Sequence, residues 1–154
     1  MIVLDVPDET AMARLAARIS ALAEPGDVIA LKGDLGTGKT SFARAFIRAR
    51  SGREEEVPSP TFTLLQVYEE YPTAIWHFDL YRLRSHEDAL ELGIEDAFAE
   101  GISLIEWAER LGDLLPPRRL EIALAFGQRP ESRLASLDPG TGWPARMTAI
   151  TSDA

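Results

Sequence analysis

The sequence predicts an α/β fold: a three-layer sandwich with a mixed sheet, in which parallel core strands are combined with antiparallel hairpins. The first observation behind this prediction is an apolar strand, a glycine-rich loop and an amphipathic helix in succession over residues 27–48. The second is a pair of segments rich in aromatic and β-branched residues, over 61–68 and 74–80, with a short turn between them. No linker divides the 154 residues, so we expect one domain over 1–154.

The N-terminal part of the chain is expected to hold two strands and two helices. Residues 2–6 predict a short strand, and acidic residues just beyond it favour a helix start, because they face the positive end of the helix dipole. Pro25 and Gly26 end that helix. Residues 27–32 then form the strand, and 41–48 the helix, on either side of the glycine-rich loop.

The remainder of the chain is expected to complete the sheet. A polar loop over 51–60 leads to the hairpin, which turns near residues 71–72. A helical stretch over about 85–98 is interrupted near Gly93. The tail beyond about residue 138 carries only weak signals. The last expected strands are a buried one that ends in an acid, over 101–107, and an antiparallel pair over 120–126 and 133–137.

The glycine-rich loop fits the phosphate-binding pattern G-x-x-x-x-G-K-[ST], and it lies between a strand and a helix as that pattern requires. The structural alternative is a glycine-rich turn before a helix. Backbone N–H groups of such a loop bind phosphate, so we predict a P-loop NTPase-like fold that binds a nucleoside triphosphate. Lys39 is expected to reach the β- and γ-phosphates, and the Thr40 hydroxyl to ligate Mg²⁺. The expected nucleotide contacts are Gly33, Asp34, Leu35, Gly36, Thr37, Gly38, Lys39, Thr40 and Ser41.

Two acidic residues, Asp79 and Glu106, end apolar strand candidates. An acid that holds Mg²⁺ or orients water is found at such a strand end, beside a phosphate loop. The alternative for each is an acid that caps the next helix or faces water. The hydroxyl-bearing segment 59–63 lies where loops often sense the γ-phosphate, although an ordinary turn-rich loop explains the same residues. His77 and His86 have no further ligand candidates beside them and are interpreted as structural.

The composition argues against several classes of function. The formal net charge is −9 and the pI is about 4.7, which disfavours a protein that binds nucleic acid by itself, because phosphate binding relies on Lys and Arg. No segment approaches the roughly 18 apolar residues of a membrane span, and no secretion signal is recognised. The absence of cysteine excludes disulfides and is compatible with a cytoplasmic location.

Four strings in the chain are informative together: Gly33-Asp34-Leu35-Gly36-Thr37-Gly38-Lys39-Thr40, Ser59-Pro60-Thr61-Phe62-Thr63-Leu64, His77-Phe78-Asp79-Leu80-Tyr81-Arg82-Leu83 and Ile105-Glu106-Trp107. In this order and spacing they resemble the bacterial TsaE family, once called YjeE, over roughly residues 5–137. The phosphate loop is shared by many families, whereas the second and third strings are much more specific.

The TsaE resemblance implies a small Mg²⁺-dependent ATPase needed to make threonylcarbamoyladenosine in tRNAs that read codons starting with A. The implied partners are TsaB-like and TsaD-like proteins, of which TsaD performs the carbamoyl transfer. This chain would then contact tRNA only indirectly, through that complex, and no membrane partner is implied. We expect the ATP hydrolase activity to be low without the partners.

The resemblance also implies roles for single residues. Lys39 matches the phosphate-binding lysine and Asp79 the essential acid, which makes these two the expected catalytic residues. Thr40 and Glu106 match the magnesium ligands. Met12 stands where the family usually carries threonine, so an N-terminal contact to the nucleotide base is in doubt. Further nucleotide contacts are implied for Thr61, Thr63 and Arg133.

Two other functions stay open beside the ATPase. In the first, ATP occupancy gates the assembly of a complex and turnover is incidental. In the second, the chain is a small-molecule kinase, although such enzymes use an arginine-rich lid and no compact arginine cluster occurs here. GTP is not expected, because neither Asn-Lys-x-Asp nor Thr-Lys-x-Asp occurs in the sequence.

Overall fold

The computed structural model describes residues 1–52, 56–69 and 72–151. Residues 53–55 of the expected polar loop and Tyr71 of the expected hairpin turn therefore lie outside the described residues. In chain order the elements are β1 (Ile2–Val6), α1 (Glu9–Leu22), β2 (Val28–Lys32), α2 (Lys39–Ser51), β3 (Leu65–Tyr68), β4 (Ile75–Asp79), α3 (His86–Glu91), α4 (Ile94–Glu100), β5 (Ile102–Glu106), the 3₁₀ segment η1 (Ala108–Leu114), β6 (Leu120–Phe126), β7 (Arg133–Asp138) and α5 (Pro144–Thr151).

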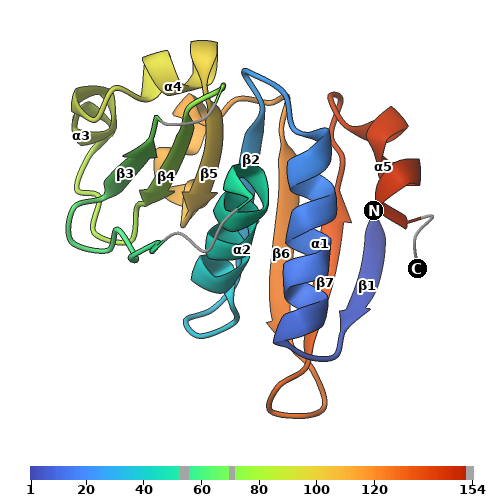
Figure 1. The fold of residues 1–154 in the computed structure, drawn as a ribbon. Coiled ribbons are helices and arrows are strands. Elements are labelled where there is room, and N and C mark those ends of the chain that lie inside the picture. The colour runs from blue at the N-terminus through green and yellow to red at the C-terminus, as the bar shows by residue number, and fades with distance from the viewer. Residues whose placement is uncertain (53–55, 70–71, 152–154) are drawn as a thin grey trace.

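The strands form one seven-stranded mixed sheet in the order β1-β7-β6-β2-β5-β4-β3 (Figure 1). β2 lies between β5 and β6 and is parallel to both, and β4 is parallel to β5. The pairs β3–β4, β6–β7 and β1–β7 are antiparallel. The prediction of a mixed sheet with parallel core strands and antiparallel hairpins is therefore confirmed.

Helices cover both faces of the sheet, which gives the three layers. One face packs against α1, α2 and α5, and Figure 1 shows α1 and α2 in front of the central strands. This core includes the fully buried side chains of Ile29 and Phe42. The other face packs against α3, α4 and η1 around Phe78 and Ile105. Because both faces are covered, the central strand β2 has a continuous apolar sequence instead of an alternating one.

The β3–β4 hairpin begins later in the chain than the sequence indicates. The side-chain pattern predicted a strand from Thr61, but β3 begins at Leu65. Leu64 has a left-handed backbone, with a φ of 66°, and its N–H donates to the Pro60 carbonyl at 2.7 Å. The segment before β3 is therefore a turn. It brings the Thr61 hydroxyl to the end of β4 instead of extending the sheet.

Gly93 separates the helical stretch predicted from the sequence into α3 and α4. Its φ of 86° lies in the left-handed region, which glycine adopts without a steric cost from a Cβ atom. The predicted interruption is confirmed. In the part of the chain that the structure describes, no helix is both long and apolar enough to span a lipid bilayer.

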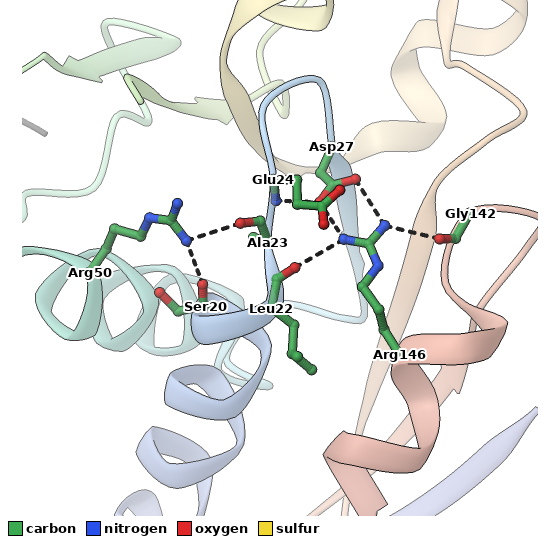
Figure 2. A network of polar contacts seen from close by, with 8 residues as sticks. All are labelled: Ser20, Leu22, Ala23, Glu24, Asp27, Arg50, Gly142 and Arg146. Carbon is green, nitrogen blue, oxygen red and sulfur yellow. Dashed lines mark hydrogen bonds and ion pairs between the residues drawn. The ribbon is translucent and has the colours of Figure 1, made fainter. Parts of the chain in front are cut away.

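The C-terminal tail, where the sequence carried only weak signals, forms α5 and fastens the turn between α1 and β2 (Figure 2). Arg146 of α5 donates to both carboxylate oxygens of Asp27, at 2.6 and 3.1 Å, and to the Leu22 carbonyl at 3.0 Å. Arg50 of α2 donates to the Ser20 carbonyl at 2.6 Å. Two arginines from different helices thus donate hydrogen bonds to carbonyl groups at the end of α1.

Candidate nucleotide-binding site

The glycine-rich loop, Asp79 and Glu106 meet at one edge of the sheet. Asp79 is the last residue of β4 and pairs in register with Glu106, the last residue of β5. β5 in turn neighbours β2, which leads into the loop. Because parallel strands end at the same edge, segments that are distant in sequence surround one hollow of about 240 Å³. Its lining residues are Leu35, Gly36, Gly38, Lys39, Thr40, Ser41, Thr61, Asp79, Glu106 and Trp107.

The loop can take its curled shape only with glycine at position 33. The φ of Gly33 is 143°, and a Cβ atom there would lie 2.5 Å from the Leu124 carbonyl oxygen and 2.6 Å from the Thr37 hydroxyl. That hydroxyl donates to the Asp34 carbonyl at 2.8 Å and braces the loop from within. α2 follows directly, and its N-cap Gly38 has no side chain to occupy the first N–H groups. Loop and helix start therefore form a site suited to an anion.

The Lys39 side chain is nearly buried and held by the loop itself. Its ammonium donates to the carbonyls of Gly33 and Asp34, the latter at 3.1 Å, and lies 4.1 Å from the centroid of the Trp107 ring. Burial lowers the pKa of Lys39, and the nearby negative charge of Glu106 offsets that effect only in part. A phosphate anion at this position would favour the charged ammonium.

The Glu106 carboxylate has a separate partner on each oxygen. The Thr40 hydroxyl donates to Oε1 at 2.9 Å, and Nε2 of His77 lies 2.7 Å from Oε2. Glu106 is 2% exposed and His77 is fully buried. From the sequence, His77 is predicted to be structural only. Its position two residues before Asp79 in a strand puts both side chains on one face, a signal that could have placed it near the site.

Asp79 is held by the turn before β3 and by the backbone after β4. Its Oδ2 accepts from the Thr61 hydroxyl at 3.0 Å, and its Oδ1 accepts from the Tyr81 N–H at 3.1 Å. The Ser59 hydroxyl lies 2.8 Å from that of Thr61. The structure thus brings Thr61 to the hollow, whereas Thr63 is exposed and is not among the lining residues.

Arg133, the first residue of β7, lies against the outside of the phosphate loop. Its guanidinium donates to the Thr37 carbonyl at 3.1 Å and the Gly36 carbonyl at 3.2 Å. Its contact with the site is therefore through the loop backbone. Next to it, a smaller hollow of about 100 Å³ is lined in part by Met12, whose thioether offers no hydroxyl to a ligand.

The hollow is lined both by oxygen atoms that could bind a metal ion and by the Lys39 ammonium. The Thr40 hydroxyl and the carboxylates of Asp79 and Glu106 are ligands of the kind that a hard divalent cation binds. Lys39 and the loop N–H groups suit phosphate. The predicted residues that line the hollow are Leu35, Gly36, Gly38, Lys39, Thr40, Ser41, Thr61, Asp79 and Glu106, while Gly33, Asp34, Thr37 and Arg133 shape or brace the loop.

Known proteins are similar to this chain in sequence and in fold. The family model described as Threonylcarbamoyl adenosine biosynthesis protein TsaE matches residues 6–134. The tRNA threonylcarbamoyladenosine biosynthesis protein TsaE of Rickettsia felis is 42% identical over 124 residues, which cover 80% of this chain and 71% of the relative. The protein of that name from Bacillus subtilis is 40% identical over 120 residues, covering 77% and 72%.

A solved structure agrees with the sequence matches. The crystal structure of YdiB from Bacillus subtilis superposes with a TM-score of 0.82 at 26% identity, over 99% of this chain and 95% of that one. This similarity confirms the predicted P-loop-like α/β fold. Because the family model covers well over half of the sequence and relatives exceed 30% identity, this chain belongs to the TsaE family of threonylcarbamoyl adenosine biosynthesis proteins.

Proposed function

We propose that this chain is a Mg²⁺-dependent ATPase that supports a TsaB–TsaD-like complex in making threonylcarbamoyladenosine in tRNA. The observation that carries the proposal is the 2.9 Å contact between the Thr40 hydroxyl and the Glu106 carboxylate, formed beside the Lys39 ammonium. Phosphoryl-transfer sites of the P-loop class pair a loop hydroxyl with a strand-end acid in this way, next to the phosphates. The names of the relatives support the tRNA pathway.

The triphosphate would bind along the loop and the start of α2. Lys39 would exchange the carbonyls of Gly33 and Asp34 for phosphate oxygens, and its charge would then be compensated by phosphate instead of by neutral carbonyls. The backbone N–H groups of the loop would supply the remaining donors. Met12 lacks the hydroxyl that the family usually carries, so its side chain would offer no hydroxyl contact to the base.

The side chains present fit Mg²⁺, because they offer oxygen ligands beside the end of the glycine-rich loop. Thr40 would supply its hydroxyl oxygen and Glu106 its carboxylate, and phosphate and water oxygens would complete six ligands. When bound, Mg²⁺ supplies positive charge beside the leaving diphosphate and the transferred γ-phosphoryl group. Glu106 would keep the Thr40 hydroxyl oriented, since it accepts the hydrogen bond from that hydroxyl and leaves the lone pairs of the hydroxyl oxygen available to the cation.

We assign Asp79 to the attacking water. Its carboxylate lines the hollow, and the Tyr81 N–H fixes Oδ1. If Thr61 turns towards a bound γ-phosphate, Oδ2 becomes free to accept a hydrogen bond from a water molecule. That exchange would tie water activation to the presence of the third phosphate.

An ATP-gated binding module is the second candidate. The observation that favours it is that both Asp79 oxygens are engaged, by Thr61 and by Tyr81. A carboxylate held in this way also suits a switch that reports the γ-phosphate through the turn before β3. ATP occupancy would then regulate the complex, and hydrolysis would be incidental.

Asp79→Asn separates the two functions, because asparagine keeps the size of the side chain and loses its charge. For the ATPase we expect near-normal ATP affinity, no phosphate release, and no restored threonylcarbamoyladenosine in tRNA of a strain depleted of this chain, measured by mass analysis of nucleosides. Restored modification without hydrolysis would instead establish the gated module. The control is Lys39→Ala, which we expect to weaken ATP binding by about 10- to 100-fold through the loss of charge-assisted contacts to phosphate.

A further inference from the structure

One buried side chain next to the candidate site has no role in the function proposed above. His77 lies in the middle of β4 and is fully buried, and its Nε2 is 2.7 Å from Oε2 of Glu106. In the register of the sheet, His77 is opposite Leu104 and Asp79 is opposite Glu106, so the two strands turn these side chains to the same face. The imidazole therefore lies directly behind the acid that contacts Thr40.

The hydrogen bonds determine which imidazole nitrogen carries the proton. An ionised carboxylate only accepts, so Nε2 of His77 must donate to Glu106. Nδ1 is buried and has no hydrogen-bond partner among the described residues. A bare Nδ1 is less costly there than an N–H without an acceptor, which favours the tautomer with its proton on Nε2.

Without this donor, the Oε2 atom of Glu106 would be buried without a hydrogen bond. The Lys39 ammonium lines the same hollow and is the alternative partner for that oxygen. A flexible glutamate would then turn towards Lys39, away from Thr40. Such an ion pair would compete with phosphate for the ammonium and remove the carboxylate from the Thr40 hydroxyl.

We propose that His77 is a positioning residue that holds Oε2 of Glu106, so that Oε1 stays on Thr40 and the carboxylate does not collapse onto Lys39. This inference rests on the proposed function, since it assigns a support to the acid of the metal side. An apolar core side chain of the same volume could not donate this hydrogen bond to Glu106 and so could not support ligand binding in this way. Partners that orient a metal-side ligand commonly change metal affinity by about 10- to 100-fold when they are removed.

The test compares His77→Gln with His77→Leu. A glutamine amide can place its N–H near the position of Nε2, whereas leucine fills the space and donates nothing. A purely structural His77 would tolerate leucine at least as well as glutamine, because the site is buried. The matched control is Ser103→Ala: Ser103 is also fully buried, lies on β5, and its hydroxyl has no partner among the described residues.

ATP affinity is measured by calorimetry with Mg²⁺ and with EDTA, together with the melting temperature of each free variant. We expect the gain in affinity that Mg²⁺ confers to fall about 10-fold or more in His77→Leu and to stay near the wild-type value in His77→Gln and Ser103→Ala. An undiminished gain in His77→Leu, or an equal loss in both His77 variants, would overturn the inference. A wild-type protein that gains nothing from Mg²⁺ would instead contradict the proposed function.

A second measurement tests the inference without any nucleotide. The chain has two histidines, so His86→Gln leaves the His77 imidazole as the only one in a nitrogen-15 NMR spectrum. We expect a protonated Nε2, an unprotonated Nδ1, and a change in both signals when Glu106→Gln is added. A proton on Nδ1, or signals that do not respond to Glu106→Gln, would show that His77 does not hold the carboxylate.

Discussion

At the scale of single residues, Glu106 is held at both carboxylate oxygens. One oxygen accepts from Thr40 and the other is paired with His77, while its charge also acts on Lys39. A buried carboxylate is costly unless it is hydrogen-bonded, and here each oxygen has a partner. That leaves the negative charge available to a cation from outside the chain.

Glu106→Gln tests the metal role of this charge. We expect it to weaken ATP binding in the presence of Mg²⁺ much more than in EDTA, because the amide is similar in size but is a poorer ligand for a hard cation. Calorimetric titrations under both conditions measure the difference. The control is Glu121→Gln on β6, where the carboxylate pairs with Lys32 at 3.1 Å and with Arg119, away from the hollow. Equal weakening with and without Mg²⁺ would contradict the metal role.

At the scale of elements, the site and the clamp made by α5 lie at opposite ends of β2. The phosphate loop follows the last residue of β2, whereas Arg146 binds Asp27, the residue just before its first. The guanidinium is also 3.7 Å from the centroid of the Trp143 ring, which is almost fully buried. α5 thus closes the core of one face without approaching the loop.

Arg146→Leu should destabilise the protein while nucleotide affinity is preserved. We expect a loss of about 2–4 kcal/mol in the free energy of unfolding, because Asp27 and two carbonyls lose charge-assisted donors. Denaturant unfolding measures the loss, and calorimetry checks that ATP affinity is retained. Arg129→Leu is the control, since the Arg129–Glu131 pair is well exposed and such pairs contribute little. A stability change no larger than that of the control would show that α5 is not clamped by this contact.

At the scale of the whole molecule, the negative net charge disfavours a polyanion, whereas the local site suits a small anion. The formal net charge is −9, so long-range electrostatics repel a polyanion, although the hollow itself is lined by Lys39 and by the start of α2. We expect a small anion to reach that local site and the overall negative charge to disfavour a tRNA backbone. An acidic protein in a tRNA pathway is understandable if another protein holds the RNA.

We therefore expect the isolated chain to bind tRNA weakly at physiological salt and its phosphate release to rise when a TsaB–TsaD-like pair is added. The partner would contribute what the free site lacks, either a positive group or an ordered turn before β3, as trans-acting groups do for other P-loop enzymes. A tRNA titration and steady-state phosphate release, with and without the partner pair, measure both effects. Tight tRNA binding by the chain alone, with turnover that the partners do not change, would contradict this expectation.

The sequence by itself determined the features that depend on neighbours along the chain. The phosphate loop, the break at Gly93 and the antiparallel β6–β7 pair are all local patterns, in which backbone freedom, spacing and turn chemistry act within a few residues. Asp79 and Glu106 were also recognisable, because each ends an apolar strand. Their roles in catalysis and metal binding stay predictions.

Only the tertiary structure decided which distant groups meet. The partner of β1 is β7, at the far end of the chain, and no local signal specifies it. Leu64, predicted as strand, lies in a turn, and Thr61 of the same segment contacts the distant Asp79. His77 acquires a partner only when β4 and β5 align in register. Strand order and register are set by the packing of the whole sheet between its two helical layers. The free energy of that packing comes from contacts between distant segments, so no single segment reveals it.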